Sequence, residues 1–80
     1  SNDGTVFAYV AEHNLHVIFN KPVSSGQIVA YDLLGRELIN KSLTTKTHYI
    51  LPISQKSNIF VLNIYTDKTI LLRQTLVNKR

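Results

Sequence analysis

The chain contains no cysteine, methionine or tryptophan. Without cysteine, neither disulfides nor thiolate-bound metal clusters can stabilise the fold, and cysteine usage gives no indication of the redox compartment. No apolar run approaches the roughly 20 residues that a membrane-spanning helix requires. Charged residues make up only 18% and hydrophobic residues 44% of the chain, so the apolar content is sufficient for a core.

The residues that are present favour strands over helices. Val, Ile, Leu, Thr and Tyr are frequent, whereas Ala and Glu are few. Seven strand-like segments are separated by turn-forming residues every 8–12 positions: residues 5–10, 15–20, 27–33, 37–43, 47–51, 59–65 and 70–77. Residues 37–43 alternate too irregularly to show one buried face, which predicts a strand with a twist or bulge there. This spacing predicts an all-β fold, an immunoglobulin-like antiparallel β-sandwich of about seven strands. Residues 59–65 are apolar on both faces, which predicts a central strand.

Eighty residues are enough for one domain of modest stability. We predict a single β-sandwich over residues 5–80, preceded by a linker or remnant at residues 1–4. The start of the chain is polar and shows neither an initiator methionine nor an export leader. The chain is therefore expected to be a piece of a larger protein whose remainder lies on the N-terminal side.

The net charge of +4 is a moderate basic excess that is scattered along the chain. Single lysines at predicted turns and strand ends are typical of a solvated surface or of protected sheet edges. Only Arg73, Lys79 and Arg80 gather near one end, and these residues are the candidates for binding a partner. A nucleic-acid partner is not predicted.

Residues 27–38 predict a β-hairpin. Alternating apolar residues lead into Gly35, which can adopt the positive φ that a tight turn demands. Asp32 and Glu37 flank this turn, and with Arg36 beside them they are expected to form a local ion pair rather than a catalytic carboxylate pair. Tyr31, Asp32, Gly35 and Arg36 are expected to hold the shape of the hairpin.

No arrangement of residues predicts catalysis, a cofactor or a metal site. His13 and His16 have a ligand-like spacing for a helix, but on a turn or a strand they point in different directions, and His48 is remote in sequence. The chain also has four tyrosines and three phenylalanines, which could form stacking platforms for a glycan or a single-stranded nucleic acid. We expect these rings to fill the space between the sheets instead, because aromatics within strands are usually core residues.

Several segments resemble the type A C-terminal sorting domains of proteins exported by the type IX secretion system of Bacteroidetes. The resemblance spans residues 7–79 and is strongest in the hairpin VAYDLLGREL at residues 29–38. The other similar segments are LHV at 15–17, YILPIS at 49–54, NIFVLNI at 58–64 and the closing strand at 71–79. The chain differs from the family in having Asn58 for glycine and Phe60 for tyrosine, and in lacking a Pro-Asn-Pro entry motif.

The resemblance implies a non-catalytic sorting signal at the C-terminus of a larger cargo protein. The implied partners are secretion-machinery proteins in the outer membrane and the N-terminal cargo domain. The domain itself is expected to have neither a transmembrane segment nor a cofactor. The implied location is the periplasm in transit and then the cell surface or the medium. Exposed edge strands also allow a strand-to-strand dimer. The alternatives are a structural or adhesive spacer and a carbohydrate-binding module, because sandwiches support many unrelated functions.

Overall fold

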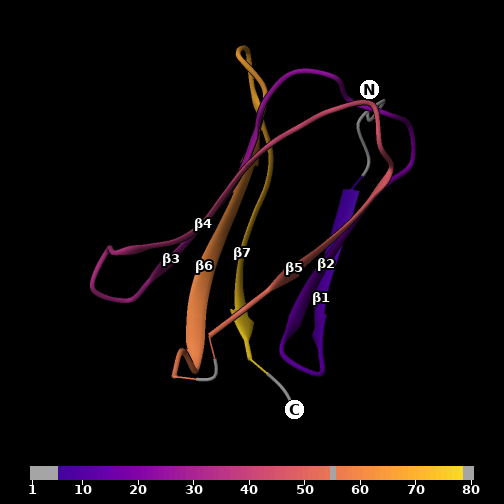
Figure 1. Ribbon diagram of the computed structural model, residues 1–80. Helices are drawn as coiled ribbons and strands as arrows, with labels where there is room; N and C mark the ends of the chain where they lie inside the picture. Colours follow the sequence, from indigo (N-terminus) through magenta and orange to yellow (C-terminus); the bar gives the residue numbers. More distant parts are fainter. Residues whose placement is uncertain (1–5, 55, 79–80) are drawn as a thin grey trace.

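The computed structural model describes residues 6–54 and 56–78 of the chain. Seven antiparallel strands form two sheets that face each other, which confirms the predicted immunoglobulin-like sandwich (Figure 1). The three-stranded sheet has the order β1-β2-β5 and consists of β1 (Val6–Ala11), β2 (Asn14–Phe19) and β5 (His48–Pro52). The four-stranded sheet has the order β4-β3-β6-β7 and consists of β3 (Gln27–Asp32), β4 (Glu37–Ser42), β6 (Ile59–Tyr65) and β7 (Ile70–Val77).

The order of the strands differs from that of a constant-type immunoglobulin domain. The chain forms three hairpins, β1–β2, β3–β4 and β6–β7, with the single strand β5 between the second and the third. The connections between these units cross from one sheet to the other. In the constant-type arrangement the fourth strand joins the sheet of the first strand. Here β4 pairs with β3 instead, so that the β3–β4 hairpin extends away from the rest of the sandwich, on the left of Figure 1.

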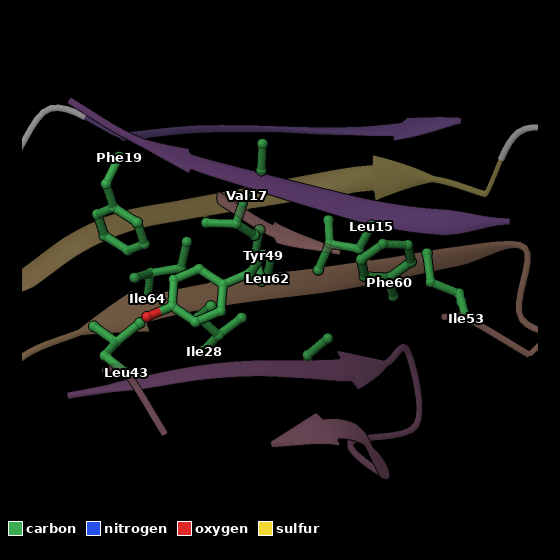
Figure 2. Packing of buried hydrophobic residues seen from close by; sticks show 12 residues of the cluster. Leu15, Val17, Phe19, Ile28, Leu43, Tyr49, Ile53, Phe60, Leu62 and Ile64 are labelled. Atoms are coloured by element: carbon green, nitrogen blue, oxygen red, sulfur yellow. The ribbon is translucent and has the colours of Figure 1, made fainter. Parts of the chain in front are cut away.

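The core consists of alternate side chains that both sheets direct inward (Figure 2). The inward residues of β2 and β6 are almost completely buried, and Phe19 meets the ring of Tyr49 edge to face at 5.8 Å between centroids. The Tyr49 hydroxyl donates to the carbonyl of Thr44 and accepts from its backbone N–H, so this large ring is buried without an unsatisfied polar atom. The cluster comprises Ala8, Leu15, Val17, Phe19, Ile28, Ala30, Leu43, Tyr49, Ile53, Phe60, Leu62 and Ile64.

The strand β6 lies between β3 and β7, which confirms that it is central. The irregularity predicted for residues 37–43 is also present, because the register of β3 with β4 shifts between Ala30 and Tyr31. A second register shift lies between Ile64 and Tyr65 in the pairing of β6 with β7. Both shifts lie in pairs that include an edge strand of the four-stranded sheet.

The expectation that all the aromatic rings fill the core is wrong for four of them. Tyr31 is half-buried on the outer face of the four-stranded sheet and is not part of the core cluster. Phe7, Tyr9 and Tyr65 are 60%, 45% and 37% exposed. In β1 the small residue Ala8 points inward, and the strict alternation of a strand then places both Phe7 and Tyr9 on the outer face. A large apolar side chain therefore did not by itself identify the buried face.

Two short connections contain backbone conformations that few residues adopt easily. The β1–β2 turn is the residue pair Glu12 and His13, with φ of 52° and 65°, as a type I′ hairpin turn requires. Gly26 precedes β3 with φ of 143°, and a Cβ atom there would collide with the carbonyl oxygen of Tyr65. Within the described ranges, no helix is long and apolar enough to cross a membrane.

Candidate functional site

The tip of the β3–β4 hairpin is held together by the carboxylate of Asp32. Its Oδ1 accepts hydrogen bonds from the backbone N–H groups of Leu34 and Arg36, and its Oδ2 accepts from Arg36 Nε at 2.7 Å. The backbone N–H of Gly35 donates to the Asp32 carbonyl, and Gly35 has φ of 86°. These bonds define a three-residue loop in which a type I turn is followed by a left-handed glycine.

The same contacts determine the charge state of Asp32. The pKa of Asp32 lies below its ordinary value of 3.8. The hydrogen bond from the Arg36 backbone N–H is the largest cause of this lowering, and desolvation acts in the opposite direction. The Arg36 side chain and the Leu34 N–H lower the pKa further. Arg36 and Asp32 thus form the expected local ion pair, and Asp32 is ionised at neutral pH.

The hairpin presents two apolar side chains to solvent. Leu33 is 67% exposed and Leu34 is 80% exposed, and neither side chain takes part in the hydrogen bonds of the turn, to which Leu34 contributes its backbone N–H. Beside them lies an open depression of about 610 Å³ between the hairpin and the connection that leads into β6. The far side of this depression includes Ser54, Lys56, Ser57, Asn58 and Ile59.

The depression is where separate segments of the sorting-domain resemblance meet. The hairpin segment supplies one wall, and the segments at residues 49–54 and 58–64 contribute Ser54, Asn58 and Ile59 to the other. These segments are remote in sequence, and each reaches this end of the sandwich through a different strand, β3, β5 or β6. The fold therefore gathers on one surface three of the five segments that carry the resemblance.

The predicted partner-binding residues are not all placed together. Arg73 lies opposite Asn63 on the outer face of the four-stranded sheet, and its Nε donates to Asn63 Oδ1 at 3.0 Å. Lys79 and Arg80 lie outside the described residues. Tyr31 is half-buried on the same outer face, between Glu37 and Val61. Arg73 borders a separate depression at the β6–β7 turn, and it is not among the residues that line the depression at the hairpin.

Asn78 follows β7 and links the end of this strand to the connection between β5 and β6. Its backbone N–H donates to the carbonyl of Asn58, and its side-chain amide donates to the carbonyls of Ser54 and Ser57. Its Oδ1 lies 3.2 Å from Nδ1 of His13 in the β1–β2 turn. The end of β7, the β1–β2 turn and the connection into β6 are thereby tied together at one end of the sandwich.

A second surface is the outer face of the three-stranded sheet, which carries no Lys, Arg, Asp or Glu. We call it the uncharged face, and it consists of Phe7, Tyr9, Ala11, Asn14, His16, Ile18, His48, Ile50 and Pro52. The rings of Tyr9 and His16 are parallel, with centroids 4.7 Å apart. Each of these two rings therefore covers one face of the other.

His13 and His16 make separate contacts, which confirms the expectation that they point in different directions. His13 contacts Asn78, whereas His16 meets His48, with Nδ1 and Nε2 separated by 3.2 Å. The adjacency of β2 and β5 creates this pair, and no signal in the sequence spacing identifies it. In the part of the chain that the structure describes, no group of three or more His, Cys, Asp or Glu residues could hold a metal ion.

The geometry defines a small β-sandwich with two candidate binding surfaces, the hairpin tip and the uncharged face. No family model matches the chain, and comparison with curated proteins and with solved structures finds no significant match.

Proposed function

We propose that this domain is a non-catalytic sorting domain at the C-terminus of a larger exported protein, recognised by an outer-membrane secretion machinery. The observation that carries the proposal is the meeting of three segments of the resemblance around the depression beside the hairpin tip. A sorting signal must be read as a surface, so the residues that define it must lie together in the folded domain.

The hairpin tip has the physical properties of a protein-binding element. The hydrogen bonds to Asp32 fix the loop conformation, so little conformational entropy is lost on binding. Leu33 and Leu34 offer exposed apolar area, which gives most of its free energy when a partner covers it. Lys56 lines the depression, and Arg73, Lys79 and Arg80 are proposed to bind the partner at a second place on the domain. These basic residues would favour a partner with acidic groups.

The export assay uses a soluble reporter fused ahead of residues 1–80 in a host with a type IX secretion system. The intact fusion is expected at the cell surface or in the medium, after passing through the periplasm. A fusion that lacks residues 70–80 is expected to stay inside. Because this deletion removes β7 and its half-buried core-facing residues, it also destabilises the fold, and it cannot serve as the only comparison.

A surface variant separates recognition from folding. Leu33→Ser with Leu34→Ser removes the exposed apolar area without touching the hydrogen bonds of Asp32. We expect reduced export at an unchanged thermal midpoint. The matched control is Ile50→Ser, an exposed apolar residue on the three-stranded sheet, which should leave export unchanged. Periplasmic retention of the intact fusion would contradict the sorting proposal.

The second candidate is a structural or adhesive accessory module of a secreted surface protein. The observation in its favour is the uncharged face, because an outer sheet surface without charge is suited to contact with another surface. Retention of the intact fusion in the periplasm would favour this function. A glycan platform built from Tyr9 and Tyr65 has no geometric support, because these two exposed tyrosines lie on different sheets.

A further inference from the structure

His16 and His48 lie side by side on the uncharged face although they are 32 positions apart in sequence. His16 is in the middle of β2, and His48 is the first residue of β5, opposite Ile18. Their rings have centroids 5.5 Å apart and are inclined at 44°. His16 is half-buried and His48 is exposed, so the pair is open to solvent on one side.

We propose that His16 and His48 form a two-histidine site for a divalent transition metal ion, Zn²⁺ or Cu²⁺. Imidazole nitrogen is a good ligand for both ions. This proposal does not depend on the sorting function, because it rests on a different face of the sandwich and on different residues.

The separation of the two nitrogens fits a shared metal ion. With Zn–N bonds of about 2.0–2.1 Å, nitrogens 3.2 Å apart subtend an angle of about 100° at the metal, near the tetrahedral value. In the metal-free chain one of these nitrogens donates its N–H to the other. On metal binding both present lone pairs, so His16 carries its proton on Nε2 and His48 carries its proton on Nδ1, with no net proton release from neutral rings.

The surroundings favour a cation. The parallel ring of Tyr9 holds one face of His16, and Ile50 lies opposite His16 on the neighbouring strand, so His16 is oriented before the metal arrives. The exposed His48 can adjust its ring. Although the chain has a net charge of +4, no Lys or Arg lies on the uncharged face to repel the ion.

The ligand count determines the kind of site. Within the described residues no third histidine or carboxylate joins the pair, so water completes the coordination sphere. Two imidazoles and water give a moderate affinity, and Cu²⁺ should bind more tightly than Zn²⁺ by the general order of divalent metal affinities.

The test is a titration of the 80-residue chain, without a polyhistidine tag, followed by NMR of nitrogen-15 in the histidine rings. Zn²⁺ should shift Nδ1 of His16 and Nε2 of His48 together and leave His13 unchanged. Acidification should release the metal, because protonated imidazoles cannot ligate. Zn²⁺ should also raise the thermal midpoint, since the ion binds the paired histidines of the folded state.

Substitutions assign the ligands. His16→Gln and His48→Gln should each weaken Cu²⁺ and Zn²⁺ binding about tenfold or more, because each leaves a single ligand. His13→Asn is the control, because asparagine tolerates the positive φ of His13 and this residue lies at a different site. Unshifted ring nitrogens in the parent chain, or unweakened binding in the His16→Gln, His48→Gln double variant, would overturn the proposal.

Discussion

At the residue scale, Asp32 determines the conformation of the hairpin tip through both of its carboxylate oxygens. Three hydrogen bonds from Leu34 and Arg36 reach this one side chain, which is 14% exposed. The side chain thereby satisfies backbone donors that the sharp turn leaves without ladder partners. The side chains of Leu33 and Leu34 can face solvent because the turn uses only backbone atoms of these residues.

Replacing Asp32 by asparagine should lower the free energy of unfolding at neutral pH. The neutral amide cannot pair with Arg36 Nε as the carboxylate does, and it accepts weaker hydrogen bonds. The folded-state pKa of Asp32 is below its unfolded value near 3.8, so the stabilisation is present above that value and is lost as the pH falls through the folded-state pKa. The difference between Asp32→Asn and the parent should therefore shrink in acid.

Urea unfolding from neutral pH to below 3.8 measures this difference. Asp67→Asn is the control, because Asp67 accepts a single side-chain hydrogen bond, from the Ser25 hydroxyl. A difference between parent and Asp32→Asn that does not change with pH would contradict the role of the ionised carboxylate.

Two glycines allow a comparison between backbone strain and steric collision. Gly35→Ala should destabilise by about 1–3 kcal/mol, the usual cost of a strained backbone, because the residue has φ of 86° but no atom within 4 Å of an added Cβ. Gly26→Ala should cost more, because its φ is also positive and the added Cβ meets the Tyr65 carbonyl oxygen. Denaturant unfolding of both variants tests the order, and equal losses would argue against the collision.

At the scale of single elements, β6 is central to the four-stranded sheet and contributes three residues to the core. It lies between β3 and β7, and the side chains of Phe60, Leu62 and Ile64 are fully buried. Its central place follows from a sequence that is apolar on the inner face and largely apolar on the outer face. The edge strands β4 and β7 carry more polar residues and pair with register shifts, as sheet edges commonly do.

Leu62→Ala should destabilise the domain by about 2–5 kcal/mol, the range for a leucine truncated in a packed core. The matched control is Leu34→Ala, which removes the same atoms from a side chain that is 80% exposed, and it should change the stability by no more than about 0.5 kcal/mol. The measurement is urea unfolding. A large loss for Leu34→Ala would show that the hairpin tip packs against the domain.

At the scale of the whole molecule, the ends of distant strands are joined by Asn78. This residue bonds to three carbonyls in the connection into β6 and contacts His13 in the β1–β2 turn, so it couples both sheets at one end of the sandwich. The edge strand β7 is thereby anchored at its last residues. Anchoring of this kind matters in a small domain, whose core buries a limited share of the chain surface.

Asn78→Ala should lower the stability by about 1–3 kcal/mol, because the side-chain hydrogen bonds are lost and two carbonyls lose a partner. Asn78→Ala should also speed amide hydrogen exchange at the end of the β6–β7 ladder, where Ile59 pairs with Val77. Asn40→Ala is the control, because Asn40 is exposed and bonds only to the side chains of Gln27 and Glu37, so its loss should be smaller. Equal losses for the two variants would contradict the anchoring role of Asn78.

The sequence by itself determined the features that depend on neighbouring residues. Apolar and β-branched segments separated by turn residues located all seven strands. The positive φ available to Gly35 together with the carboxylate of Asp32 predicted the hairpin and its ion pair. The central place of β6 followed from its apolar residues on both faces. These features arise from local steric and hydrogen-bonding preferences, which act within a few residues.

Only the tertiary structure decided which residues from distant strands meet. The pairing of β2 with β5 brings His16 to His48, and Asn78 reaches Ser54 and Ser57 through the closing of the sandwich. The same closing gathers the hairpin and the connection into β6 around one depression. Pairing and register between distant strands arise from the burial of a shared core, which no local pattern encodes, and both candidate surfaces are products of that burial.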